Sequence, residues 1–224
     1  MKRLNSKLKP IAFATLTALA LSAPIAAQAE VSAGISLATM YLWRGQDVSN
    51  SAPEISGSLD YSHSSGFYAG MWTSSEAPGH SYEQDLYVGY AKSFGDFGID
   101  LAIYEYLYPE TKDDTGKRVP FYASDISEYM IKLSYTDLSL TTYINTSTQD
   151  ENKNQYFSLD YSYQKFGFHA AFSHFNDSSN NYQDFNVSYA LTDNASVTVS
   201  KAIGKADIQK NALVMFSYSI PLKL

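Results

Sequence analysis

The chain has 224 residues, with 16 Lys and Arg against 23 Asp and Glu, a formal net charge of −7, and no cysteine. The negative charge makes nucleic acid a poor partner, and the lack of cysteine excludes disulfides and thiolate metal sites. The 19 Tyr and 12 Phe favour strands over helices, and no window after the first 29 residues has the roughly 18 apolar residues of a membrane-spanning helix.

Residues 1–29 have the order of a secretory signal peptide: a basic start, an apolar run over 11–21 and the exit Ala27-Gln28-Ala29. An N-terminal membrane helix is the alternative, but the run is too short and Pro24 interrupts it. Cleavage would remove four basic residues and leave 12 against 23 acidic ones, a net charge of −11. We therefore expect a signal peptide at 1–29 and one exported domain at 30–224.

The first element after this leader alternates with a period of two, which predicts a strand over 31–44. In this strand Trp43 would face lipid at an aromatic girdle, Arg44 would point into the mouth of a barrel, and Gly45 would open the first loop. Two roles for Arg44 stay open: pairing with a carboxylate of the wall, or acting in a pore.

The same alternation recurs along the chain, and we expect twelve strands in all. The later ones are predicted at 54–62, 67–75, 84–93, 97–108, 124–135, 138–145, 155–163, 166–175, 183–190, 195–202 and 211–222. The segment 97–108 alternates less regularly, which predicts a bulge or an early exit from the bilayer.

Short and long connections alternate without exception between these segments. The short ones are 63–66, 93–96, 136–137, 164–165 and 192–194, and the long ones are 46–52, 75–83, 109–123, 146–154, 176–182 and 203–211. A soluble sandwich has no reason to sort its loops in this way, whereas outer-membrane barrels have short periplasmic turns and long outer loops. The sequence therefore predicts an all-β fold, a closed antiparallel up-and-down transmembrane barrel with both termini in the periplasm.

The predicted inward face carries more acidic than basic side chains. The acidic ones are Glu54, Asp60, Asp85, Asp100, Glu128, Asp160 and Asp184, and the basic ones are Arg44 and Lys132. Unpaired carboxylates require water, so this excess predicts a narrow wet lumen that attracts cations. The alternative is a paired network that only fills the interior. We expect selectivity to be set by Arg44, Glu54, Asp60, Asp85, Asp100, Glu128 and Lys132.

Aromatic residues are also predicted to line the lumen. They are Tyr68, Trp72, Tyr87, Tyr104 and Tyr143. Such rings either bind a sugar or aromatic solute or simply fill space.

Catalytic and metal signals are weak. His63 and His80 lie in connections, and His169 and His174 lie on opposite faces of one predicted strand. His169 shares a face with Ser173, and this pair is the only feature that supports the hypothesis of a lipid-modifying enzyme. There is no His-Glu-x-x-His motif, so no catalytic residue, metal site or cofactor is predicted. Acidic loop pairs at 113–114 and 150–151 are either solvated charge or ligands for divalent ions that bridge lipopolysaccharide.

Several motifs in the first half of the chain resemble one known family. They are Tyr41-x-x-Arg44-Gly45, Pro53 with Gly57, Gly66-Phe67-Tyr68-x-Gly70-x-Trp72, Asp85-Leu86-Tyr87-x-Gly89-Tyr90 and Tyr106-x-Tyr108-Pro109. Together they are similar to the TorF family of outer-membrane porins, also described as the Gcw_chp domain. The match is dense over 31–109, and beyond about residue 124 only Glu128 and the strand rhythm agree.

The resemblance implies a porin in the outer membrane of a Gram-negative bacterium, without naming a solute. The partners expected are outer-membrane lipid and lipopolysaccharide, the barrel-assembly machinery and small hydrophilic solutes. One departure is the chain end, Pro-Leu-Lys-Leu, where such barrels commonly finish on an aromatic residue. A non-conducting structural or adhesive barrel is the main alternative function.

Overall fold

The computed structural model describes residues 29–75, 82–108, 126–146, 153–204, 208–209, 211–222 and 224. The strands are β1 (Glu30–Ala38), β2 (Leu42–Trp43), β3 (Gln46–Asp47), β4 (Glu54–Ser62), β5 (Phe67–Ser74), β6 (Glu83–Phe94), β7 (Phe97–Leu107), β8 (Ile126–Tyr135), β9 (Leu138–Asn145), β10 (Gln155–Tyr163), β11 (Phe166–His174), β12 (Tyr182–Ala190), β13 (Ala195–Gly204) and β14 (Leu213–Leu222). A short 3-10 helix, η1 (Ser178–Asn180), precedes β12.

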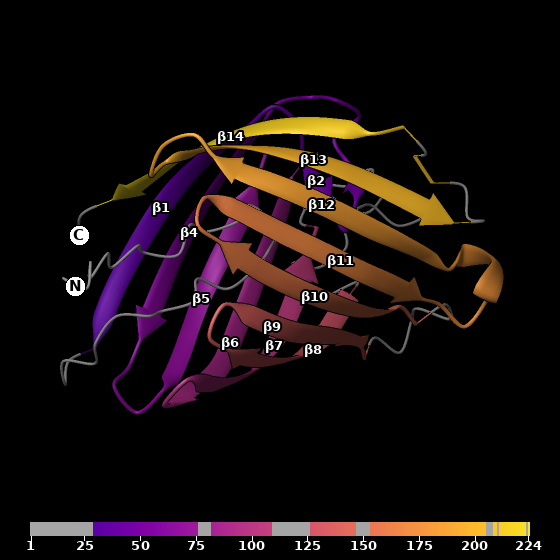
Figure 1. Ribbon diagram of the computed structural model, residues 1–224. Helices are drawn as coiled ribbons and strands as arrows, with labels where there is room; N and C mark the ends of the chain where they lie inside the picture. The colour runs from indigo at the N-terminus through magenta and orange to yellow at the C-terminus, as the bar shows by residue number, and fades with distance from the viewer. Residues whose placement is uncertain are drawn as a thin grey trace, which may run out of the picture.

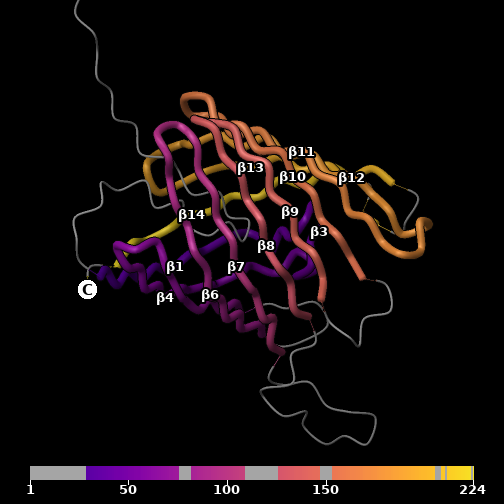
Figure 2. The backbone as a smooth tube through the Cα atoms, turned by 90° about the horizontal axis from the view of Figure 1, so that it is seen from below, coloured from indigo at the N-terminus to yellow at the C-terminus, as the bar shows by residue number. Residues whose placement is uncertain are grey.

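Twelve of these strands form one closed barrel in the order β1-β14-β13-β12-β11-β10-β9-β8-β7-β6-β5-β4 (Figure 1). Figure 2 shows β6, β7, β8 and β9 side by side in chain order. The ring closes because β1 pairs in antiparallel fashion with both β14 and β4, so each of the twelve barrel strands is paired on both sides. Closure satisfies the backbone groups that hydrocarbon cannot solvate. The predicted twelve-stranded antiparallel barrel is confirmed.

All the short turns lie at one end of the barrel. β1 starts at this end, opposite Ser62, and β14 ends there, where Leu222 pairs with Ala33. The longer connections are therefore at the opposite end, as the alternation of loop lengths predicted.

The outer surface of the barrel is apolar. On β10, for example, Phe157 and Leu159 are 41% and 48% exposed, whereas Ser158 between them is 4% exposed and faces inward. Large exposed hydrophobic side chains occur in this way on all twelve barrel strands. No helix in the described part of the chain has the length and hydropathy to cross a membrane.

The first predicted strand is too long. β1 ends at Ala38, and the chain then forms a hairpin in which Trp43 pairs with Gln46 across the turn residues Arg44 and Gly45. Both turn residues have positive φ, +46° and +76°, as two-residue hairpin turns require. The apolar residues past Ala38 do not continue the lipid-facing strand, because the folded-back segment buries Tyr41 and Leu42, which are 5% and 3% exposed.

The bulge predicted in 97–108 is also wrong. The pairing of β7 with β6 runs without a shift from Phe97↔Phe94 to Leu107↔Gln84. The mixed pattern arises because Tyr104 and Tyr106 fill the interior while Glu105 lies on the outward parity at the long-loop end.

Candidate functional site

The segment 39–53, which joins β1 to β4, folds back into the barrel instead of extending from it. In Figure 1 β2 lies behind β12 and β13. The Tyr182 hydroxyl on β12 donates to the backbone carbonyl of Arg44 at 3.2 Å. A Cβ at Gly45 would overlap the side chain of Asp184 on the same strand. The Arg-Gly pair is therefore a turn pressed against the inner wall, and only glycine fits its second position.

Arg44 is the central charge of this turn. It is 6% exposed, and its Nη2 donates to Glu128 Oε2 at 2.6 Å. Burial alone would lower the pKa of Arg44, but the charge of Glu128 raises it above the ordinary value, so the guanidinium stays charged. The guanidinium carbon of Arg44, Cζ, lies 4.5 Å from the ring centroid of Trp43 and 4.6 Å from the ring centroid of Tyr156. The prediction that Trp43 faces lipid is wrong, because the ring lies under Arg44 inside the barrel.

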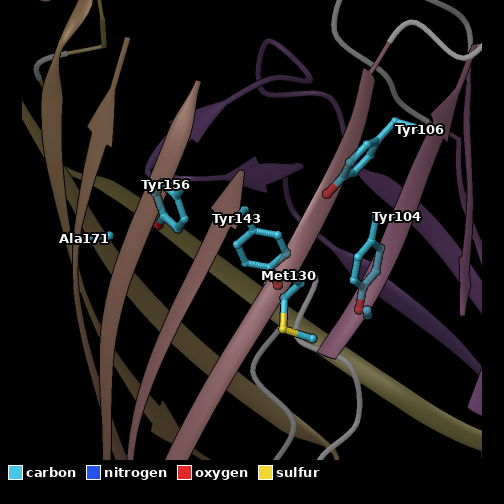
Figure 3. Packing of buried hydrophobic residues seen from close by; sticks show 7 residues of the cluster. Tyr104, Tyr106, Met130, Tyr143, Tyr156 and Ala171 are labelled. Atoms are coloured by element: carbon cyan, nitrogen blue, oxygen red, sulfur yellow. The ribbon is translucent and has the colours of Figure 1, made fainter. Parts of the chain in front are cut away.

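Tyrosine side chains of β7, β9 and β10 pack around this ion pair. Figure 3 shows Tyr143 between Tyr156 and Tyr104, with ring centroids 6.4 Å and 6.0 Å apart. Tyr106 donates to Glu128 Oε2 at 2.9 Å, and Met130 is buried in the same cluster. The long-loop half of the interior is consequently well filled.

His169 joins two carboxylates below this cluster. Its Nδ1 lies 2.6 Å from Asp160 Oδ1, and its Nε2 lies 3.1 Å from Asp184 Oδ1 and 2.8 Å from the Tyr156 hydroxyl. Both ring nitrogens are thus engaged by acids and a phenol. The arrangement does not form the serine–histidine pair that the shared face of His169 and Ser173 suggested.

The half of the interior near the short turns is less filled. Here Asp60, Asp100 and Lys132 are only half-buried. The Tyr68 hydroxyl donates to Asp100 at 2.7 Å, and the Tyr87 hydroxyl donates to Asp60.

Two glycines set the orientation of these tyrosines. A Cβ at Gly89 would overlap the Tyr68 ring, and one at Gly70 would lie 2.5 Å from the Tyr87 ring. The rings therefore lie flat along the wall and do not project across the interior.

A further group of acids lies at the long-loop end of β4 and β6. Ser74 donates to Glu54 at 3.3 Å, and Tyr108 donates to Glu83 Oε1 at 3.1 Å. Glu83 and Asp85 are almost completely buried. The sequence analysis places Glu83 in the connection 75–83, but in the structure Glu83 is the first residue of β6. It lies two residues before Asp85, and this spacing puts both side chains on the inward face, a signal that the sequence already contains.

The structure places every predicted lumen residue on the inside. These are Arg44, Glu54, Asp60, Asp85, Asp100, Glu128 and Lys132, with the aromatic residues Tyr68, Trp72, Tyr87, Tyr104 and Tyr143. Arg44 enters from the folded-in loop and not from a barrel strand. Among the described residues, no group of three or more His, Cys, Asp or Glu side chains could hold a metal ion. His80 and the acidic pairs 113–114 and 150–151 lie outside the described residues.

Comparisons with known proteins agree with the barrel. A family model described as a bacterial protein of unknown function (Gcw_chp) matches residues 22–220. A solved KdgM porin is similar with a TM-score of 0.51 and 9% identity, over 86% of this chain and 99% of that chain. A KdgM porin in complex with disordered oligogalacturonate has a TM-score of 0.46 and 10% identity, over 87% and 99%.

Acinetobacter baumannii OccAB2 has a TM-score of 0.40 and 9% identity, over 76% of this chain and 55% of that chain. No curated protein matches the sequence. At 9% identity, the likeness to the first KdgM porin shows a shared fold and nothing finer.

Proposed function

The chain belongs to the Gcw_chp family, and from this premise and the charged interior of its barrel we propose that it is an outer-membrane porin. It lets small hydrophilic solutes diffuse passively and favours cations over anions. We propose no catalytic role.

One observation carries this proposal: the distribution of polar and apolar side chains is inverted relative to a soluble protein. Large hydrophobic residues such as Leu59 and Val88 are about half exposed, while Glu128 and Asp184 are buried inside. An apolar outside needs hydrocarbon, and a charged inside needs water or counterions. A closed barrel in a membrane supplies both.

The cation preference rests on the charge balance of the interior. Arg44 is already neutralised by Glu128, so Lys132 is the remaining lysine or arginine on the described inner face. It faces Asp100 in the register of β7 and β8, and His169 lies between Asp160 and Asp184. Asp60, Glu83 and Asp85 add negative charge, and none of them has an ion pair with a described lysine, arginine or histidine. A pore with this lining attracts cations and repels anions.

The folded-in hairpin supports a narrow path. Arg44 and the tyrosines around it occupy the long-loop half, whereas the flat Tyr68 and Tyr87 rings leave the other half less filled. We propose that Arg44 stands at the constriction and that Tyr68, Trp72, Tyr87 and Tyr104 mainly fill space and shape the wall.

The membrane arrangement follows from this role. We propose that 1–29 is a cleaved signal peptide, that 30–224 is inserted by the barrel-assembly machinery of a Gram-negative bacterium, and that the short turns face the periplasm. The apolar belt then contacts outer-membrane lipid, and the long loops meet lipopolysaccharide.

A non-conducting structural or adhesive barrel is the second candidate. The observation that favours it is the dense packing of Tyr104, Tyr143 and Tyr156 around Arg44. A barrel plugged in this way would give no passage at all.

Purified, folded protein in a planar bilayer distinguishes the two candidates. The porin predicts discrete conductance steps, and vesicles containing it should swell in small sugars faster than in large ones. Absence of both steps and swelling, with folding verified by heat-dependent gel migration, would support the plugged barrel.

A further inference from the structure

The cluster around His169 connects the wall of the barrel to the Arg44 turn. Both ring nitrogens of His169 face carboxylates: Nδ1 lies 2.6 Å from Asp160 Oδ1, and Nε2 lies 3.1 Å from Asp184 Oδ1. An ionised carboxylate accepts hydrogen bonds and cannot donate them, so each contact needs a proton between its two heavy atoms. The cluster therefore holds two protons.

The hydroxyl of Tyr156 does not supply the proton between Nε2 and Asp184. It lies 2.8 Å from Nε2, but it has a single proton, which it donates to Asp184 at 3.1 Å to Oδ2. Loss of one proton from the cluster would set two acceptors against each other, and that contact would have to open. The geometry of the cluster therefore depends on its protonation.

Tyr156 and Asp184 carry this dependence to the Arg44 turn. The ring of Tyr156 lies 4.6 Å from Arg44 Cζ, and its hydroxyl contacts His169. Asp184 touches the turn directly, because a Cβ at Gly45 would overlap its side chain. Two side chains that contact His169 therefore form the surface on which the turn rests.

The titratable groups that face the ring come from three elements. Among the described residues they are Asp160 and Tyr156 from β10, Asp184 from β12 and, over the ring of Tyr156, Arg44 from the folded-in segment. The side chain of Asp160 is 32% exposed, whereas those of His169 and Asp184 are 13% and 0% exposed. Asp160 therefore connects the buried pair to the interior of the barrel, and the cluster exchanges protons through it.

We propose that His169 is the positioning residue of the constriction, and that the protons it shares with Asp160 and Asp184 make the place of the Arg44 turn depend on pH. As pH rises, loss of a proton opens one contact, frees Tyr156 and Asp184 and loosens the turn, so the passage widens. The effect on conduction rests on the proposed porin function, but the place of the turn can be measured without conduction.

Trp43 reports the place of the turn. Its ring lies 4.5 Å from Arg44 Cζ, and it is the only tryptophan left in Trp72→Phe, since the chain has two. The experiment measures acrylamide quenching of Trp43 in this parent, folded in vesicles, from about pH 6 to about pH 9.5, where exposed tyrosines stay mostly protonated. We expect quenching to rise severalfold over this range, and single-channel conductance to rise with it.

His169→Phe in the same parent is the decisive variant, because it keeps an aromatic ring and removes both nitrogens. It should show the high quenching at every pH, with a raised conductance that does not depend on pH. His174→Phe is the matched control, because His174 lies on the same strand, β11, but is exposed, and this variant should titrate like the parent. Asp160→Asn keeps the test decisive if His169→Phe fails to fold, and its quenching at neutral pH should exceed that of the parent.

Two results would overturn the positioning role: quenching of the parent that does not change with pH, or the same quenching at neutral pH in the parent, His169→Phe and Asp160→Asn. Conductance without any change in quenching removes this role and leaves the porin standing. Quenching that depends on pH in a barrel that never conducts supports the role and removes the porin.

Discussion

Arg44 shows how one cation is accommodated inside the barrel. Its charge meets Glu128, and its flat face lies over the rings of Trp43 and Tyr156. Each contact replaces part of the water that the guanidinium loses on burial. The pair therefore ties the folded-in segment to β8 on the opposite wall.

Removing Arg44 should leave the charge of Glu128 buried beside the neutral Tyr106 hydroxyl, which donates to it, and without the opposite charge that it now meets. Arg44→Ala is expected to lower the free energy of unfolding by about 3 kcal/mol. Urea unfolding in lipid vesicles, followed by tryptophan fluorescence, measures the change. Glu128→Gln in the Arg44→Ala background should restore part of the loss, since the charge left behind is removed. If the change in the free energy of unfolding of the double variant equals the sum of the changes in the two single variants, Arg44 and Glu128 do not interact.

Gly89 has no side chain, and the ring of Tyr68 occupies the space where a Cβ would be. Gly89→Ala would push a methyl group into the Tyr68 ring and to 2.7 Å from the Leu101 carbonyl oxygen, and should cost about 1–3 kcal/mol of stability. Gly34→Ala is the matched control, because the nearest atoms to its Cβ lie at 3.8 Å and 3.9 Å. Equal urea midpoints for the two variants would contradict the flat placement of Tyr68.

At this scale the sequence reveals some contacts and not others. The turn at 164–165 sets Asp160 opposite His169, so that pair could have been deduced from the predicted hairpin alone. Arg44 and Glu128 are 84 positions apart, and their contact depends on a loop that folds inward. Local periodicity carries no information about such a fold-back.

At the scale of elements, the β2–β3 hairpin is the part of the chain that departs most from a plain barrel. Its turn needs a backbone with positive φ at Gly45, and the wall at Asp184 leaves no space for a side chain there. Both constraints hold Arg44 away from solvent. The hairpin should therefore resist proteases.

Gly45→Ala should release this hairpin. Trypsin is expected to cut after Arg44 roughly tenfold faster in this variant, because cleavage follows the population of the open state. Mass spectrometry of the fragments gives the rate. Gly95→Ala is the control, since Gly95 also has positive φ, +65°, but nothing lies within 4 Å of its Cβ. Similar rates in both variants would show that contact with Asp184 does not hold the loop.

The barrel strands were predictable because lipid and interior impose opposite demands on alternate residues. The exposure of β10 and β12 alternates along each strand, with Leu159 and Phe185 outside and Ser158 and Asp184 inside. The rule fails for 39–44, where the apolar residues face the interior of the barrel instead of lipid. The same rule predicts a strand that begins at residue 84, whereas β6 begins at Glu83. Glu83 was therefore not predicted to face the interior.

At the scale of the whole molecule, the outer belt predicts where charge is tolerated. Leu159 and Leu191 are 48% and 47% exposed, but the first lies in the middle of β10 and the second in a short turn. Leu159→Arg should cost about 2–4 kcal/mol in vesicles, and Leu191→Arg at most about 1 kcal/mol. Urea unfolding in vesicles measures both. Similar costs would mean that Leu159 does not face hydrocarbon.

The reversal potential across a planar bilayer under a potassium chloride gradient tests the central claim, that an acid-lined interior passes cations in preference to anions. The account predicts a potential with the sign of potassium selectivity. It also predicts that Asp60→Asn with Asp100→Asn moves this potential toward zero. A potential with the sign of chloride selectivity, or one that both substitutions leave unchanged, would contradict it.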